Sequence, residues 1–120
     1  SHLEREIIAN VVRYNIRDFD YDMMQLETEA GQDLAGVSDR TAITILIAKL
    51  TAILRLANSM DKTHKSKLID CRMAVRDGHL VVTTGYQGDL ALESASFEQK
   101  AAFFEEIFGI RPVLRQKRRV

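Results

Sequence analysis

The sequence predicts an α+β fold, in which a helical part with a long central helix is followed by a small antiparallel β-sheet covered by one helix. Apolar residues recur at helical spacing up to about residue 64 and alternate with polar residues from residue 69 onward. Asp77 and Gly78 supply a typical hairpin turn within the alternating region. We expect one compact unit with two parts, residues 1–66 and 67–120.

The first helix is expected over residues 2–14. Ser1 and Glu4 have the spacing of a capping box, and one helical face is apolar through Leu3, Ile7, Ile8, Val11 and Val12. Because monomers rarely expose so large an apolar face, we expect preceding helices in the full protein and regard the chain as a fragment. Without those helices, the chain is expected to form a homodimer through this face.

A long second helix is expected after an acidic loop over residues 16–37, which has room for one short helix at 21–29. Ser38 or Asp39 would cap the long helix, and it would continue to about His64, roughly 39 Å at 1.5 Å per residue. Polar residues interrupt its apolar stretch at Thr44, Lys49, Thr51 and Arg55. This pattern favours the buried helix of a soluble protein over a membrane span.

The second part is predicted to be a β-hairpin, a helix and an edge strand. The hairpin strands are expected at residues 69–76 and 80–86, and a second turn at 87–89 leads into residues 90–93. Ser96 and Gln99 have the spacing of a capping box for the helix, and Gly109 has the position of its C-terminal cap. Pro112 lacks an amide donor, so residues 110–114 are expected at the edge of the sheet.

Composition narrows the classes of function. The 17 basic and 17 acidic residues cancel, and the pI of about 6.8 is not that of a dedicated nucleic-acid binder. Cys71 is the single cysteine, which excludes an intrachain disulfide and a zinc-finger framework and favours the cytoplasm. The first residues are charged and periodic, so they predict neither a signal peptide nor a membrane anchor.

Two segments carry a resemblance to a known family. The segment 8–14 reads IANVVRY, and the segment 49–64 reads KLTAILRLANSMDKTH, with Arg55, Asp61 and His64 in step. Together with the hairpin and the last helix, they resemble the C-terminal region of the exopolyphosphatase / guanosine pentaphosphate phosphatase family over nearly the whole chain. By this resemblance, residues 1–66 are a partial HD-like helical domain and residues 67–120 are the small C-terminal lobe.

The resemblance implies a hydrolase as the parent protein. Enzymes of that family remove terminal phosphate from polyphosphate or guanosine pentaphosphate, with Mg²⁺ and actin-like lobes that would precede this chain. No Gly-rich phosphate loop and no clustered carboxylates occur here, so we expect no catalytic residue in this chain and no turnover by it. By the resemblance, Asn15 and Asn58 stand at positions that HD-type metal ligands usually occupy, so we expect no metal and no cofactor in the chain.

The candidate polyanion-binding residues are the cations at the end of the long helix: Arg55, Lys62, His64, Lys65 and Lys67. Helical spacing would align most of them with Thr51 and Asn58 in one polar stripe, and Lys and Arg neutralise phosphate charge. An ordinary solvated helix end has the same composition. Arg55 could instead pair with Asp18 or Asp20, and Asp61 with Lys65.

The function that we predict is that of an accessory domain, which helps the parent enzyme bind polyphosphate and supplies dimer contacts. The alternative is a pure interaction module with no role toward anions. We expect no membrane partner, and nucleic acid ranks lowest. The basic end at residues 115–119 is expected to be frayed, and Phe97, Phe103, Phe104 and Phe108 are expected in the core with Cys71.

Overall fold

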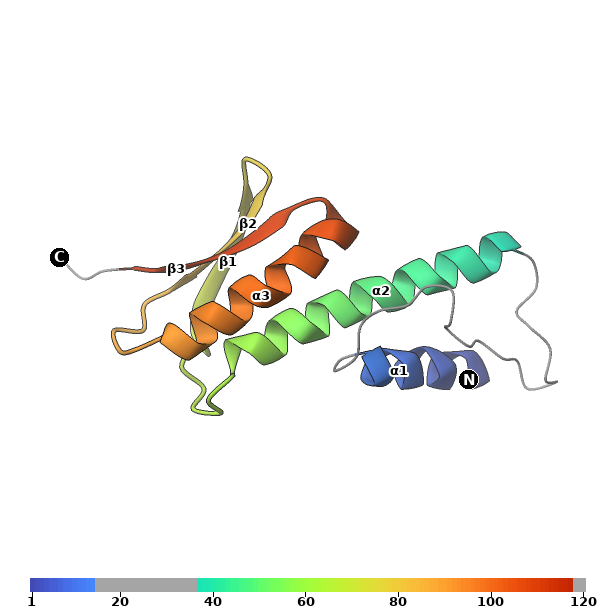
Figure 1. The fold of residues 1–120 in the computed structure, drawn as a ribbon, viewed down its shortest axis with the longest axis horizontal. Coiled ribbons are helices and arrows are strands. Elements are labelled where there is room, and N and C mark those ends of the chain that lie inside the picture. Colours follow the sequence, from blue (N-terminus) through green and yellow to red (C-terminus); the bar gives the residue numbers. More distant parts are fainter. Residues whose placement is uncertain (15–36, 118–120) are drawn as a thin grey trace. The chain divides into compact units, whose positions relative to one another are not determined.

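A computed structural model describes residues 1–14 and 37–117 of the chain, with residues 37–40 described by their backbone alone. The predicted acidic loop as far as residue 36, its short helix and Asn15 therefore lie outside what is described. The long helix that Ser38 or Asp39 was predicted to cap already contains both residues, so neither is its N-terminal cap. The described residues form an α+β fold of three helices and three strands (Figure 1). They divide into two compact units, Ser1–Thr51 and Ala52–Val120, whereas the sequence predicted the change between its two parts at residue 66.

The first unit contains helix α1 (His2–Tyr14) and the beginning of helix α2 (Val37–Met60). The predicted capping box is present, because the hydroxyl of Ser1 accepts a hydrogen bond of 3.2 Å from the amide of Glu4. The apolar face of α1 is divided. Ile7 and Val11 pack in a cluster around Tyr14, Ile43 and Ile47, whereas Ile8 and Val12 are exposed.

Helix α2 ends at Met60, earlier than the predicted end near His64. His64 and Ser66 have positive φ angles of 58° and 51°, which no α-helix contains. The carboxylate of Asp61 accepts a hydrogen bond of 3.0 Å from the amide of Ser66 and closes this turn. The segment Thr41–Met60 is long and apolar enough to cross a bilayer, a test by length and composition that core helices of soluble proteins also pass.

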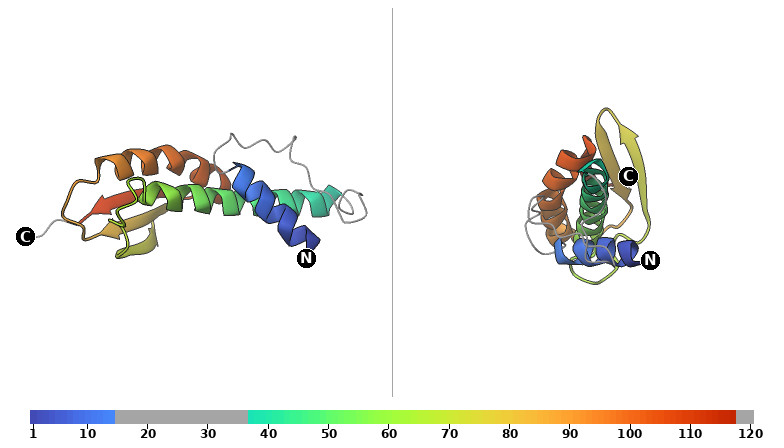
Figure 2. Two further views of the ribbon diagram at one scale, coloured as in Figure 1. Left: turned by 90° about the horizontal axis from the view of Figure 1, so that it is seen from below. Right: turned by 90° about the vertical axis from the view of Figure 1, so that its right-hand side faces the viewer.

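The sheet in the second unit is mixed, and this corrects the prediction of an antiparallel sheet. Strand β1 (Cys71–Arg76) pairs antiparallel with β2 (His79–Thr84), and β2 pairs parallel with β3 (Arg111–Gln116). The reason is helix α3 (Ala91–Phe108), which connects β2 to β3 and returns the chain to the end of the sheet where β2 began. A crossover of this kind gives parallel strands, as Figures 1 and 2 show.

Helix α3 begins before the predicted capping box. Its first residue is Ala91, whose amide donates a hydrogen bond of 2.8 Å to the carboxylate of Asp89. Ser96 is therefore a buried residue inside the helix and not its cap. The predicted end is confirmed, since Gly109 adopts a left-handed φ of 74° and its amide donates to the carbonyl of Glu105.

The core of the second unit lies between the sheet and the helices. Ala52 and Leu56 of α2, Val82 of β2, and Phe97 and Phe104 of α3 form one buried cluster. Phe103, Phe108 and Cys71 are partly buried against it, so the prediction that the phenylalanines and the cysteine belong to the core is confirmed. Bulky side chains thus cover one face of the sheet.

The hairpin turn and the edge strand agree with the prediction. Asp77 and Gly78 have φ angles of 50° and 76°, both positive, as a two-residue turn between twisted strands requires. The strand order β1-β2-β3 places β3 at an edge. The amides of Arg111 and Lys117 donate toward β2, so by alternation the nitrogen of Pro112 points away from it.

Candidate anion-binding face of the sheet

The face of the sheet opposite the core is open in the described part of the second unit. Side chains alternate between the two faces of a strand, so the full burial of Val82 under the helices places Val81 and Thr83 on the other face. Arg72 pairs with Thr83, and Thr83 pairs with Arg115. These three side chains therefore form one row across the open face.

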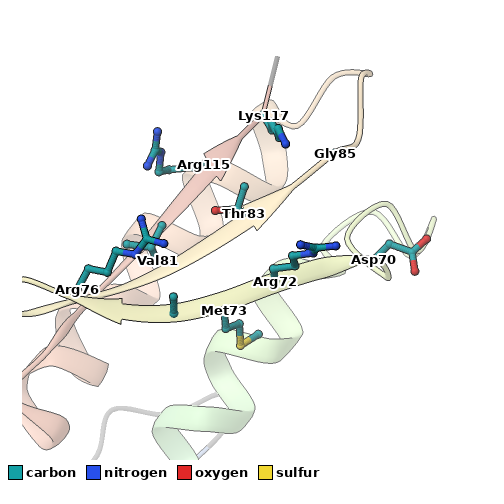
Figure 3. Close-up of a pocket in the computed structure, with 10 residues that line it drawn as sticks. Asp70, Arg72, Met73, Arg76, Val81, Thr83, Gly85, Arg115 and Lys117 are labelled. Carbon is teal, nitrogen blue, oxygen red and sulfur yellow. The ribbon is translucent and has the colours of Figure 1, made fainter. Parts of the chain in front are cut away.

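A hollow of about 510 Å³ lies over this open face. Figure 3 shows its lining residues, among which four are cationic: Arg72, Arg76, Arg115 and Lys117. Among the described lining residues Asp70 is the one acidic residue, and the remaining ones are Met73, Ala74, Val81, Thr83 and Gly85. Four cations beside one carboxylate give the hollow a positive potential that the zero net charge of the chain conceals.

The predicted frayed end is in fact ordered as far as Lys117. Arg115 belongs to β3, and the amide of Lys117 donates a hydrogen bond of 2.8 Å to the carbonyl of Thr84. The prediction was wrong for residues 115–117, because continued pairing with β2 satisfies the backbone. Arg118 and Arg119 lie outside the described residues.

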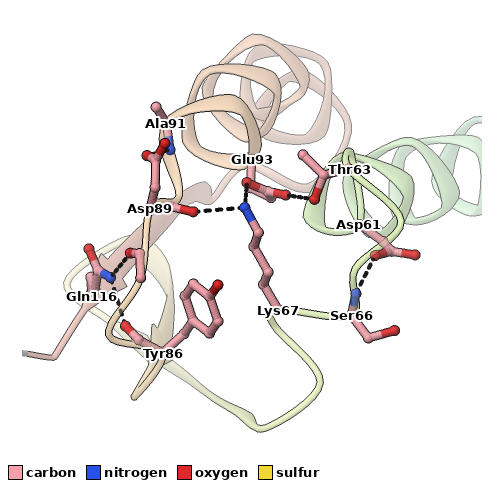
Figure 4. Close-up of polar contacts among 10 residues, drawn as sticks. Asp61, Thr63, Ser66, Lys67, Tyr86, Asp89, Ala91, Glu93 and Gln116 are labelled. Atoms are coloured by element: carbon pink, nitrogen blue, oxygen red, sulfur yellow. Dashed lines mark hydrogen bonds and ion pairs between the residues drawn. The ribbon is translucent and has the colours of Figure 1, made fainter.

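A loop after β2 supports this end of the face. The side-chain amide of Gln116 donates to the carbonyls of Tyr86 and Gly88, at 2.7 and 2.9 Å (Figure 4). The side-chain amide of Gln87 donates to the carbonyl of Lys117 at 3.1 Å. A Cβ atom at position 88 would lie 2.7 Å from the ring of Tyr86, so a side chain there would require this ring to move. Lys117 is thus held beside the sheet by contacts from both directions.

The cations that the sequence singled out occupy three different environments. Arg55 is half-buried on α2, and its guanidinium lies 4.7 Å from the centre of the Phe103 ring. Lys62, His64 and Lys65 are exposed, but they follow the end of α2 in the turn and so do not continue its helical face. The predicted stripe is therefore corrected, because the helix that would align it is too short.

Asp61 also differs from the prediction. Besides the Ser66 amide, its carboxylate lies 3.8 Å from the imidazole of His64, and it forms no ion pair with Lys65. The alternative pairing of Arg55 with Asp18 or Asp20 involves residues outside the described part of the chain.

The side chain of Lys67 makes its contacts within the fold. Its side chain is 14% exposed, and its ammonium donates a hydrogen bond of 2.9 Å to the carbonyl of Asp89. The same ammonium lies 3.6 Å from the carboxylate of Glu93 and 5.9 Å from the centre of the Tyr86 ring (Figure 4). These contacts join the segment after α2 to the start of α3.

Glu93 is the buried partner in this cluster, with a side chain that is 1% exposed. The hydroxyl of Thr63 donates to its carboxylate at 2.6 Å and is the main cause that holds the pKa of Glu93 below the ordinary value. The charge of Lys67 lowers the pKa further, whereas burial opposes both effects. The carboxylate is therefore stabilised in its ionised form.

The described residues hold no group of three or more His, Cys, Asp or Glu side chains that could bind a metal ion. Comparison of the chain with protein-family models, with curated proteins and with solved structures gave no match. The assignment of a function therefore depends on the geometry of the chain itself.

Proposed function

We propose that the chain is a polyanion-binding accessory domain and that the open face of its sheet is the binding surface. The observation that carries the proposal is the hollow of about 510 Å³ whose lining includes Arg72, Arg76, Arg115 and Lys117. Guanidinium and ammonium groups bind phosphate oxygens by charge-assisted hydrogen bonds. A rigid sheet also fixes their spacing before the ligand arrives, which lowers the entropic cost of binding.

The shape of the surface favours an extended anion over a compact one. Arg72 and Arg115 lie two strands apart in one row, roughly 10 Å between their Cβ atoms. Arg76 lies four residues further along β1, roughly 13 Å from Arg72. No aromatic side chain is among the described residues that line the hollow, so these residues offer no platform for stacking of nucleic-acid bases. A linear polyphosphate fits these features.

We further propose, from the family that the sequence resembles, that the parent protein is an exopolyphosphatase or a guanosine pentaphosphate phosphatase. In such a protein the catalytic lobes and Mg²⁺ would lie outside this chain. The open face would hold the part of a phosphate chain that is distant from the reacting end. This role requires charge and spacing but no catalytic residue in the chain.

A titration with polyphosphate at several salt concentrations tests the proposal. Arg115→Ala with Lys117→Ala removes two charges from the open face, and Lys62→Ala with Lys65→Ala removes two charges from the turn, so the two variants have equal net charge. We expect the first variant to bind more weakly and to lower the salt dependence by about one unit of slope per lost phosphate contact. The second variant should bind nearly as well as the original chain.

Two results would contradict the proposal. If both double variants bound polyphosphate equally weakly, only net charge would matter. If the turn variant alone bound more weakly, the binding site would include Lys62 and Lys65 instead. A single-stranded RNA of matched charge serves as the competitor. If it displaced polyphosphate efficiently, the preference for a linear phosphate chain would be wrong.

A further inference from the structure

The two edges of the sheet are protected to different degrees. Strand β3 contains Pro112, which has no amide to offer to another strand, and packs against α3. Strand β1 contains no proline, and no strand pairs with its outer side in the described part of the chain. An unprotected edge of six residues is a template for pairing with a further strand.

The register identifies the backbone groups that face outward from β1. The amides of Arg111 and Lys117 donate to the carbonyls of Gly78 and Thr84, so the even-numbered residues of β2 point their backbone groups toward β3. The odd-numbered ones point toward β1, where they pair with Arg72, Ala74 and Arg76. The amides and carbonyls directed outward are therefore those of Cys71, Met73 and Val75.

The side chains beside this edge are apolar and exposed. Met73 and Val75 are 57% and 64% exposed, although they lie on the side of the sheet that the helices cover. Ile69, which precedes the strand, is 78% exposed. Met73 points toward α2, away from the cationic face (Figure 3). Ala57, Met60 and Leu68 line an apolar hollow of about 330 Å³ next to Met73. The edge therefore offers backbone hydrogen bonds and apolar surface together.

We propose that a second copy of this chain pairs with β1, antiparallel and centred on Met73, so that two sheets join into one of six strands. In this register Met73 meets Met73 of the second copy, and Cys71 meets its Val75. Asp70 directly precedes β1 and lines the cationic hollow. Pairing that continues by this one residue places it opposite Arg76 of the second copy, twice by symmetry. Arg72 lies opposite Ala74, so no two like charges are directly opposed.

Charge selects this register against its neighbours. If the second strand is shifted by one residue, its outward backbone groups no longer meet those of the first strand, and its side chains change faces. The available registers are therefore those that pair Cys71, Met73 or Val75 of one copy with one of these residues in the other. Those that place Cys71 or Val75 opposite Met73 would bring Arg72 opposite Arg72 or Arg76 of the second copy. Like charges directly opposite are destabilising, whereas the pairing of Asp70 with Arg76 is favourable.

The symmetry also limits the assembly to two copies. An antiparallel contact of a strand with itself is isologous, so each copy uses its β1 edge once and leaves none free. The remaining edges of the joined sheet are the two β3 strands, where Pro112 opposes further pairing. The interface shares Asp70, Arg72 and Arg76 with the lining of the proposed anion site. The two proposals are tested separately, because the anion test changes Arg115 and Lys117, which lie on and directly after the strand farthest from β1.

A charge exchange tests the interface in the full chain by sedimentation over a range of concentrations. Asp70→Arg should weaken the dimer about tenfold or more, because it replaces two favourable pairs by two repulsive ones. Adding Arg76→Asp to Asp70→Arg should restore the dimer. Glu98→Arg on α3, which makes the same change of charge away from β1, should have no effect, and thermal unfolding checks that every variant is folded.

A disulfide tests the register. In a Cys71→Ala background, Met73→Cys should form a disulfide between the two copies under mild oxidation. A disulfide joins Cα atoms that are roughly 4.4–6.8 Å apart, and directly opposed residues of antiparallel strands lie within this range. Ala74→Cys in the same background should not. A chain that stays monomeric at high concentration, a dimer that Asp70→Arg leaves unchanged, or a dimer that depends on Ile8 of α1 instead would overturn the proposal.

Discussion

The two faces of strand β2 differ in what their residues do. Val82 is fully buried in the core with Phe97 and Phe104, whereas its neighbours Val81 and Thr83 line the cationic hollow. Apolar burial is the main source of folding free energy, and exposed cations contribute little to it. Substitutions on the two faces should therefore separate stability from binding.

The largest effect is expected from Phe97→Ala. Phe97 is fully buried, and loss of a buried phenylalanine destabilises a protein by about 3–5 kcal/mol. Since small proteins have a total stability of about 5–15 kcal/mol, a large part of the free energy of unfolding would be lost. Val81→Ala on the open face should change it by less than about 1 kcal/mol. Denaturant unfolding of both variants, read as the difference in free energy, checks this contrast.

An intermediate effect is expected from Glu93→Gln, which removes the charge that faces Lys67 and keeps the size of the side chain. The folded state holds the pKa of Glu93 below the ordinary value of 4.5. The carboxylate therefore stabilises the fold fully above pH 4.5, and this contribution is lost as the pH falls through the folded-state pKa.

The measurement is the melting temperature as a function of pH. At pH 7 the variant should melt at a lower temperature than the original chain, and the difference should shrink as the pH falls below 4.5. Glu98→Gln, an exposed change on the same helix, is the control and should leave the profile unchanged. A difference between Glu93→Gln and the original chain that stays constant down to pH 3 would show that packing, and not charge, accounts for the role of Glu93.

Local patterns in the sequence correctly predicted helix ends and turns where the type of one or two residues determines the backbone conformation. Ser1 with Glu4, the turn at Asp77 and Gly78, and the cap at Gly109 are all present, because each depends on near neighbours only. Ser96 misled the prediction for a related reason. Its capping pattern is genuine in sequence, but Asp89 already satisfies an amide at the start of α3, and the longer helix buries Ser96.

The cationic face was not apparent from the sequence because it depends on pairing between distant strands. The alternation of Arg72 and Arg76 with apolar residues is visible in the sequence. The two-residue spacing of Arg115 and Lys117, which would place them on one face of a strand, is visible as well. Only the parallel register of β3 with β2, which brings Thr83 opposite Arg115, places the two pairs on one face. Local spacing instead favoured the cations after α2, where a turn interrupts the helix.

The smallest effect is expected at Arg55, which belongs to the predicted polyanion set but has an aromatic partner. Its guanidinium lies 4.7 Å from the centre of the Phe103 ring, and such a contact contributes about 0.5–1 kcal/mol. Arg55→Met keeps much of the apolar stem and removes the charge. We therefore expect a loss of stability of about that size and unchanged binding of polyphosphate.

Phe103→Leu provides the matched test of the Arg55 contact. If the ring holds the guanidinium, the effects of the two substitutions on the free energy of unfolding should be less than additive in the double variant, because each alone removes the same interaction. Binding of polyphosphate gives the second readout. A clear loss of affinity in Arg55→Met, with stability intact, would return Arg55 to the anion site and show that the two functions are not confined to separate faces.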